Sequence, residues 1–178
     1  MDSPIRVATE ADCEAICSIY NHYVDHCTCT FQTERETVQE RLDWMRAHGP
    51  RHPVIVYRDG ADVVGWASLN RYHPRGAYRF TAELSIYHEH RNHRRGIGSE
   101  LMTDLIDRAR TLGYHVLIGG VCGEREPSLR LHESFGFAKV GHFPKVGFKF
   151  GRWLDVAYYQ LTFNENRPPI EDEPDGGP

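Results

Sequence analysis

The chain has 178 residues, a length typical of one domain that can bury a hydrophobic core. Its 25 acidic and 21 basic residues leave a net charge of −4, so no broad basic field favours nucleic acid as a partner. The absence of a long apolar segment and of a signal-like start argues against membrane insertion and predicts a cytoplasmic protein. Five cysteines, an odd number without secretory context, predict reduced thiols.

Two helices are predicted near the start of the chain, after a short strand at residues 5–8. Thr9 precedes two acids as an N-cap does, and the first helix follows it. Its apolar stripe at helical spacing consists of Ala11, Ala15, Ile16, Ile19, Tyr20 and Tyr23. Residues 34–47 predict a second helix with Val38, Leu42 and Met45 turned inward.

Three strands are predicted next. Residues 54–57 and 63–69 are joined by an Asp-Gly turn, which favours a hairpin. Residues 78–87 alternate in polarity. The apolar face carries Tyr78, Phe80, Ala82, Leu84 and Ile86, and the other face carries Arg79, Thr81, Glu83, Ser85 and Tyr87. This strand therefore presents the carboxylate of Glu83 on its polar side.

A basic stretch with two glycines, residues 88–112, follows that strand. Three arginines precede Gly96 and Gly98, and a helix with a continuous apolar stripe then runs to a C-cap at Gly113. A helix start with bare glycines leaves backbone N–H groups unobstructed, and the helix dipole adds partial positive charge. The stretch predicts a phosphate or pyrophosphate site, although a Gly-x-Gly turn alone is also typical of an ordinary surface helix.

The remaining elements complete a mixed fold. A strand at 116–121, a helix that begins at Glu126 and strands at 137–142 and 155–163 are predicted. The pattern indicates an α/β (α+β) fold, with a mixed central sheet flanked by helices on both faces. Residues 1–163 are predicted to form one domain. Residues 164–178 carry one basic and five acidic side chains with four prolines, which predicts a disordered acidic tail.

The segment 81–101, TAELSIYHEHRNHRRGIGSEL, resembles the acyl-CoA-binding core of the GNAT superfamily of N-acetyltransferases. In that family the pattern Gln/Arg-x-x-Gly-x-Gly/Ala holds the pyrophosphate of coenzyme A. Here the pattern reads His93-Arg94-Arg95-Gly96-Ile97-Gly98 and departs from the family at its first position. IYNHYV (19–24), PSLRLHESFGF (127–137) and VGFKFGRWLDVAYYQL (146–161) resemble the branch that acetylates phosphinothricin and methionine sulfoximine. The resemblance covers residues 4–163 in uninterrupted order.

The resemblance implies acetyl-CoA as the acetyl donor and no metal. Backbone groups of Ile86, Tyr87 and His88 are expected to hold its pantetheine arm. The residues implied for the pyrophosphate turn are Arg94, Arg95, Gly96, Ile97, Gly98 and Ser99. Arg125 stands where the branch has an asparagine that contacts the pantetheine arm, so we expect Arg125 near a donor phosphate or in solvent.

The chemistry requires a base. An alkylammonium acceptor has a pKa near 10, so roughly one molecule in a thousand is nucleophilic at pH 7. The resemblance maps Glu83 onto the glutamate that acts as general base, and an ion pair between Glu83 and Arg79 is the alternative. We expect partial burial to raise the Glu83 pKa, or a water relay to assist it. His132 corresponds to a proton donor for the leaving thiolate, with a packed core histidine as the alternative.

An amino-acid-like acceptor also carries a carboxylate that needs a cationic partner near Glu83. Arg79, on the same predicted strand face, and His73 are the candidates, and Tyr72 and Arg75 lie in the same region. We therefore predict direct acetyl transfer to a small amine. A peptide, protein or polyamine acceptor, or a non-catalytic acyl-CoA-binding module, is the alternative. Aromatic residues in the last strands, together with the resemblance, predict a homodimer.

Three other sites have weaker support. His22, His26, Cys27 and Cys29 lack a second pair at zinc-site spacing, so no metal site is predicted. Cys122 is not predicted as a nucleophile, because direct transfer to an amine needs no covalent enzyme intermediate. The basic run before the central helix is short and has no aromatic platform for nucleic acid.

Overall fold

The computed structural model describes residues 3–92 and 95–163, and seven strands within these ranges form one sheet in the order β1-β2-β3-β4-β5-β7-β6. Their bounds are β1 Ile5–Val7, β2 Val54–Asp59, β3 Asp62–Arg71, β4 Thr81–His88, β5 Val116–Cys122, β6 Ala138–Lys149 and β7 Arg152–Thr162. Neighbouring strands are antiparallel except β4 and β5, which are parallel. The predicted mixed sheet is confirmed.

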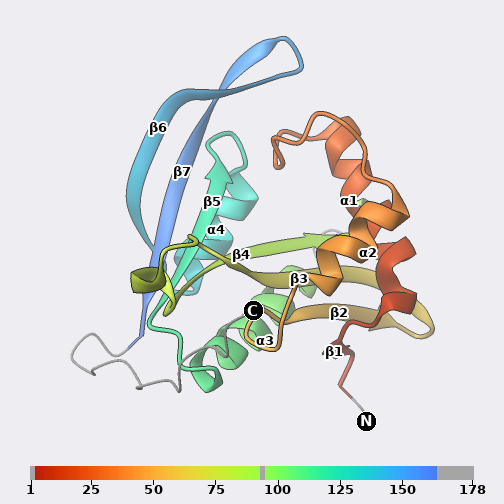
Figure 1. The fold of residues 1–178 in the computed structure, drawn as a ribbon. Coiled ribbons are helices and arrows are strands. Elements are labelled where there is room, and N and C mark those ends of the chain that lie inside the picture. Colours follow the sequence, from red (N-terminus) through yellow and green to blue (C-terminus); the bar gives the residue numbers. More distant parts are fainter. Residues whose placement is uncertain (1–2, 93–94, 164–178) are drawn as a thin grey trace.

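Helices cover both faces of the sheet (Figure 1). Their bounds are α1 Cys13–His26, α2 Val38–Arg46, α3 Ile97–Thr111 and α4 Glu126–Ser134. Val54 and Val56 of β2 pack in the cluster that contains α1 and α2, whereas Ile55 between them packs with α3 and α4. Because side chains alternate across a strand, the two helix pairs lie on opposite faces.

The central helix α3 follows its sequence pattern closely. Its buried residues are Ile97, Leu101, Met102, Leu105, Ile106 and Ala109. Gly96, at the N-cap, has φ +82°, and Gly113, just beyond the end, has φ +78°. Side chains disfavour this left-handed conformation, so both glycines set helix boundaries.

The second helix is shorter than predicted. It begins at Val38, because Thr37 caps it by accepting the Glu40 backbone N–H at 3.2 Å. Val38 was expected inside but is 42% exposed. Arg41 is buried in its place: the guanidinium lies 4.6 Å from the Tyr20 ring centre and 4.4 Å from that of Trp44, and it pairs with Glu36.

The strand predicted at 78–87 also begins later. Residues 76–78 form a 3-10 turn, and Arg79 ends this turn in a helical conformation. The Arg79 guanidinium lies 4.4 Å from the Phe80 ring centre and donates to the Gly76 carbonyl at 3.4 Å. The prediction that Arg79 shares a strand face with Glu83 is therefore wrong, whereas the burial of Phe80, Ala82 and Leu84 follows the predicted alternation.

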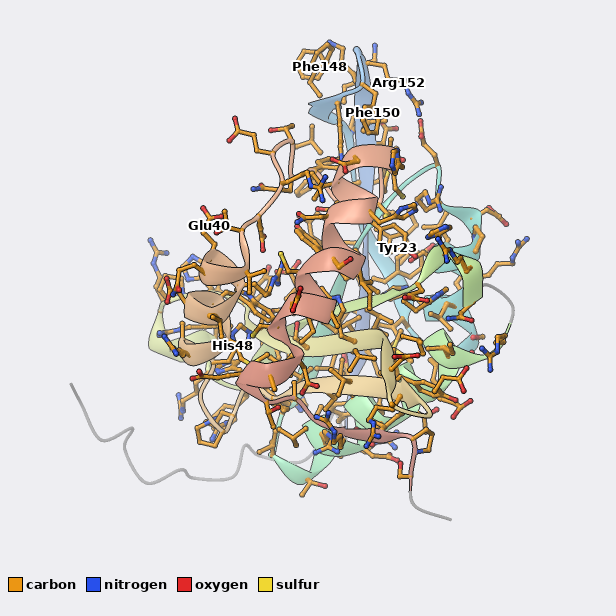
Figure 2. The ribbon with its side chains drawn as sticks, turned by 90° about the vertical axis from the view of Figure 1, so that its right-hand side faces the viewer. Tyr23, Glu40, His48, Phe148, Phe150 and Arg152 are labelled. Carbon is orange, nitrogen blue, oxygen red and sulfur yellow. The ribbon has the colours of Figure 1, made fainter. Side chains whose placement is uncertain are left out.

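The last two strands are longer than predicted. β6 and β7 form a hairpin closed by Phe150 and Gly151, both at positive φ, and this hairpin rises beyond the other strands (Figure 1). Phe148 and Phe150 lie at its far end (Figure 2). The predicted acidic tail at 164–178 lies outside the described residues. No helix in the described ranges is long and apolar enough to cross a membrane.

Candidate active site

A cleft opens where the parallel strands β4 and β5 part. The two strands pair over only three positions and the pairing ends at Glu83 and Ile118, whereas β4 continues to His88. The edge of β4 beyond Glu83 therefore faces the cleft with backbone groups that β5 does not pair. The cleft has a volume of about 410 Å³ and is lined by β4, β5, β7, α4, the start of α3 and the segment after α1.

The glycine turn forms one end of this cleft. Gly98 lines it, and a Cβ placed there would lie 3.6 Å from Leu131 Cδ2 and 3.9 Å from His88 Cδ2. The first N–H groups of a helix have no partner within the helix, and here no side chain at position 98 covers them. The turn therefore fits the pyrophosphate of an acyl-CoA.

The two arginines predicted for this turn have different outcomes. Arg95 donates to Asp59 at 2.8 Å and to Asn92 at 2.9 Å, so its guanidinium is held by the β2–β3 turn. Arg94 and His93 lie outside the described residues. Among the described residues, the backbone N–H groups of the turn are therefore the candidates for contacting phosphate.

The β4 residues predicted to hold the pantetheine arm, Ile86, Tyr87 and His88, all line the cleft. The Tyr87 ring stacks on Trp66 with ring centres 4.9 Å apart. Tyr23 of α1 donates its hydroxyl proton to the His88 carbonyl. These contacts fix the end of β4 from the side of the sheet that α1 covers.

Glu83 lies half-buried where the strands separate. Burial raises the pKa of its carboxyl group, as expected from the sequence. Gly120 of β5 approaches it: a Cβ there would be 3.7 Å from Glu83 Oε1 and 3.5 Å from Tyr158 Cε1. In the part of the chain that the structure describes, no hydrogen bond or ion pair engages this carboxylate, so the alternative pairing with Arg79 is not formed.

His132 lies buried on α4 beside the cleft, 5% exposed. Its Nδ1 lies 2.8 Å from the Ser128 carbonyl, which can only accept, so Nδ1 carries a proton. Nε2 rests over Gly119 and has no hydrogen-bond partner among the described residues. Burial lowers the His132 pKa, which favours the neutral ring with Nε2 as an acceptor.

The cleft lining also contains residues that were not predicted as site residues from the sequence: Thr30, Phe31, Gly120, Val156 and Tyr158. Two adjacent glycines inside an apolar strand were a usable signal, because glycine in a strand marks a close approach. Phe31 packs over Gly147 of β6, where a Cβ would collide with its ring. No pattern in the sequence predicts the contact between Phe31 and Gly147.

The predicted acceptor residues all lie in the loop between β3 and β4. His73 Nδ1 accepts the Arg75 N–H at 3.2 Å, and the Tyr72 ring packs edge-on against Tyr78 at 5.6 Å. Tyr72, Arg75 and Arg79 are exposed and do not line the cleft. Arg125, the N-cap residue of α4, does line it.

A larger hollow of about 730 Å³ lies elsewhere, between β1, the end of α2 and the last turns of α3. Its lining includes His48, Pro53, Asp104 and Arg108, but neither Glu83 nor the glycine turn. The smaller cleft, which joins a carboxylate of raised pKa to a glycine turn that fits a phosphate, is therefore the candidate active site.

Comparison with known proteins assigns the family. Residues 5–157 match the acetyltransferase (GNAT) domain model. A methionine sulfoximine/methionine sulfone acetyltransferase of Salmonella typhimurium is 38% identical over 93% of this chain and 97% of its own. A phosphinothricin N-acetyltransferase of Streptomyces viridochromogenes is 36% identical, covering 93% and 90%. The chain belongs to the GNAT acetyltransferase domain family.

Solved structures agree with this assignment. A putative acetyltransferase of Salmonella typhimurium, solved with acetyl-CoA, superposes with a TM-score of 0.91 at 37% identity over 96% of this chain and 99% of its own. A phosphinothricin acetyltransferase of Sinorhizobium meliloti, in complex with the same compound, gives 0.89 at 32% identity over 96% and 95%. The protein is accordingly an N-acetyltransferase whose acetyl donor is acetyl-CoA.

Proposed function

We propose that this enzyme acetylates the amino group of a small amino-acid-like acceptor, with Glu83 as the general base. The observation that carries this proposal is the half-buried carboxylate of Glu83, unpaired among the described residues, at the point where β4 and β5 part. Several relatives are named for methionine sulfoximine, methionine sulfone or phosphinothricin, all small amino-acid derivatives, and this supports the acceptor class.

Glu83 acts by removing a proton from the acceptor ammonium before attack on the thioester. The raised pKa of Glu83 lies closer to the pKa of the acceptor ammonium, so Glu83 is a stronger base than an exposed glutamate. The nitrogen lone pair then forms the new N–C bond, and the C–S bond breaks as the tetrahedral intermediate collapses. Backbone N–H groups on the free edge of β4 are suited to stabilise the oxyanion.

His132 remains a proposed proton donor to the leaving thiolate. The neutral ring carries its proton on Nδ1, which the Ser128 carbonyl accepts. Donation from Nε2 therefore requires that His132 first take up a proton there, and Nε2 is free of other partners among the described residues. The role thus depends on transient protonation of a ring whose pKa is lowered.

For the acceptor itself, we retain Tyr72, His73, Arg75 and Arg79 as proposed contacts from the β3–β4 loop. Burial, and then the nearby Glu83 and Tyr72, raise the pKa of Tyr158 in the cleft lining, which supports the nearness of this loop to the reaction centre. Arg79 enters from the loop rather than from the strand. Arg125 is the proposed contact to the donor.

A peptide acceptor is a second candidate, because one similar structure is named a ribosomal-protein-alanine N-acetyltransferase, from Brucella melitensis. It has a TM-score of 0.87 and 36% identity, covering 89% of this chain and 99% of its own. An N-terminal alanine peptide shares the free amine but lacks the neighbouring carboxylate of an amino acid. The two acceptors therefore differ in the charge that the cleft must neutralise.

We also propose that the enzyme is a homodimer in the cytoplasm. The β6–β7 hairpin carries exposed apolar side chains, with Phe148 56% and Trp153 60% exposed. A concentration of apolar surface on one projecting element is typical of an interface. All five cysteines are free, as expected in a reducing compartment.

The test is acetyl-CoA consumption with methionine sulfoximine, phosphinothricin, methionine sulfone, ordinary amino acids, polyamines and an alanine-terminated peptide, with products identified by mass spectrometry. We expect the highest kcat/KM for one of the amino-acid derivatives. Preferential turnover of the peptide would replace this acceptor class with the second candidate. A chain that binds acetyl-CoA but acetylates none of them would contradict the proposed acceptor.

A further inference from the structure

Two cysteines meet at the edge of the active-site cleft and have no part in acetyl transfer. Cys27 ends α1, and Cys29 follows after one residue, in a turn. The Cys29 backbone N–H donates to Cys27 Sγ at 3.1 Å. Because only one residue separates the cysteines and the turn brings the Cys29 backbone onto the Cys27 sulfur, the two thiols lie close together.

Two cations stabilise negative charge at this pair. The buried ammonium of Lys149 lies between the Cys27 carbonyl, at 2.8 Å, and the Thr30 carbonyl, at 2.9 Å. The neighbouring Cys29 side chain, the Cys29 backbone N–H and the positive charges of Arg125 and Lys149 together lower the Cys27 pKa. The Cys29 pKa is raised, chiefly by the neighbouring Cys27 sulfur, so Cys27 is the more acidic thiol of the two.

The pair reaches the cleft through Cys29, which is half-buried and lines it, whereas Cys27 beside it is 7% exposed. A small solute in the cleft therefore reaches the turn. Cys13 and Cys17 lie in the core beneath α1, and burial raises the pKa of both. A reactive cysteine needs both thiolate character and access.

We propose that Cys27 and Cys29 form a hydroperoxide-reactive dithiol, and that the disulfide form of this pair inhibits acetyl transfer. The Cys27 thiolate attacks one oxygen of hydrogen peroxide, the O–O bond breaks, and a sulfenic acid and hydroxide form. Cys29 sulfur then attacks the sulfenic sulfur, the S–O bond breaks, and the Cys29 proton leaves with the hydroxyl as water. One thiolate and one thiol are oxidised to a disulfide, and one peroxide is reduced to one water and one hydroxide.

Oxidation acts on catalysis through the segment that the pair belongs to. Residues 29–31 line one wall of the cleft, and the turn before them is fixed by Lys149 and by the Thr28 hydroxyl, which donates to Glu124 at 3.3 Å. An S–S bond replaces the N–H···S bond and draws the Cys29 side chain away from the cleft lining. Thr30 and Phe31, in the cleft lining, follow directly in the chain and move with it.

The experiment treats the reduced full-length enzyme with hydrogen peroxide, removes the peroxide with catalase, and divides the sample. One half is alkylated and mapped by non-reducing peptide mass spectrometry, and we expect a Cys27–Cys29 disulfide. The other half is assayed with acetyl-CoA and methionine sulfoximine. We expect the rate to fall at least about tenfold and to return with dithiothreitol, since a disulfide is reversible and higher oxides of cysteine are not.

Three variants test the result further. The acetylation rate of each variant after peroxide treatment is compared with its own rate before treatment. Cys27→Ser and Cys29→Ser should retain their rates within about twofold, because neither can form the bond. Cys122→Ser, which removes a different cleft thiol, should lose activity as the wild type does. Absence of the Cys27–Cys29 disulfide would overturn the proposal, as would a mapped disulfide with an unchanged rate. Mapping needs no acceptor, so it separates failure here from failure of the proposed acceptor class.

Discussion

Three glycines influence the shape of the cleft because they have no side chain. Gly98 leaves the helix start open, Gly119 gives room to the His132 ring, and Gly120 lies beside Glu83. A Cβ at position 119 would collide with the imidazole, whereas a Cβ at position 98 or 120 would make ordinary contacts, and only a larger side chain would fill the space beside the helix start or the carboxylate. Only Gly98 was predicted to matter, because its Gly-x-Gly pattern is local, whereas Gly119 and Gly120 depend on partners distant in the sequence.

Glu83→Gln removes the proposed base and keeps the side-chain volume. We expect kcat to fall roughly a hundredfold or more, because proton removal from the ammonium is lost. Acetyl-CoA affinity, measured by calorimetry, should stay near wild type. Glu14→Gln, at an exposed position on α1, is the control and should change neither quantity.

The pH profile gives a second measure of the same base. Glu83 must be deprotonated to act, and burial raises its pKa, so kcat/KM should fall as pH decreases through that raised pKa. The acidic limb of the profile should therefore lie at a higher pH than the one at which an exposed glutamate titrates. Glu83→Gln should abolish this limb. Wild-type kcat at saturating acceptor in the Gln variant would remove Glu83 from the mechanism.

Arg125→Ala tests which substrate this cleft arginine serves. As a donor contact its loss should weaken acetyl-CoA binding severalfold, by about 1 kcal/mol, and leave the acceptor KM unchanged. Separate KM measurements for acetyl-CoA and methionine sulfoximine distinguish the two. A tenfold rise in the acceptor KM, absent for an amine without a carboxylate, would instead assign Arg125 to the acceptor carboxylate.

At the scale of secondary structure, elements with a strong local pattern were predicted well and those set by tertiary contacts were not. α3 has six buried apolar residues at helical spacing and a glycine at each boundary. The start of β4 was placed three residues early, because Tyr78 and Arg79 extend the alternation although they belong to the 3-10 turn and its end. Arg41 was missed as a core residue, since its burial depends on rings from α1 and α2.

Gly98→Val tests the role of α3 as the phosphate-binding element. The added side chain meets Leu131 and His88 and covers the first N–H groups of the helix. We expect acetyl-CoA to bind more weakly by roughly 2 kcal/mol or more, because charge-assisted hydrogen bonds are lost. Calorimetry measures this, and circular dichroism verifies the fold. Gly49→Val is the matched control, because a Cβ there meets nothing within 4 Å. Equal affinity in a folded Gly98→Val protein would place the phosphate site elsewhere.

At the scale of the whole molecule, the projecting β6–β7 hairpin exposes apolar side chains, which packing within a single domain does not explain. Its length was underestimated because Pro144, Gly147 and Gly151 interrupt the strand pattern, and pairing across β6 and β7 overrides these breaks. The resulting strands carry apolar residues that the described chain does not cover.

Trp153→Ser combined with Phe148→Ser tests the proposed dimer. Light scattering should give a dimer mass for wild type at micromolar concentration and a monomer mass for the double variant, because a hydrophobic contact area is lost. Val7→Ser is the control: Val7 is 51% exposed on β1, at the opposite edge of the sheet, and its loss should not change the mass. A monomeric wild type would contradict the proposal.

The packing of Phe31 against Gly147 limits how the range of acceptors of this enzyme can change over evolution. Phe31 belongs to the segment after α1 and Gly147 to β6, yet the ring occupies the space of a side chain at position 147. A larger residue at 147 is incompatible with Phe31, and a smaller residue at 31 leaves a void over 147. Mutational paths to a new acceptor are thus expected to alter the two positions together, so that the benefit of either substitution depends on the other.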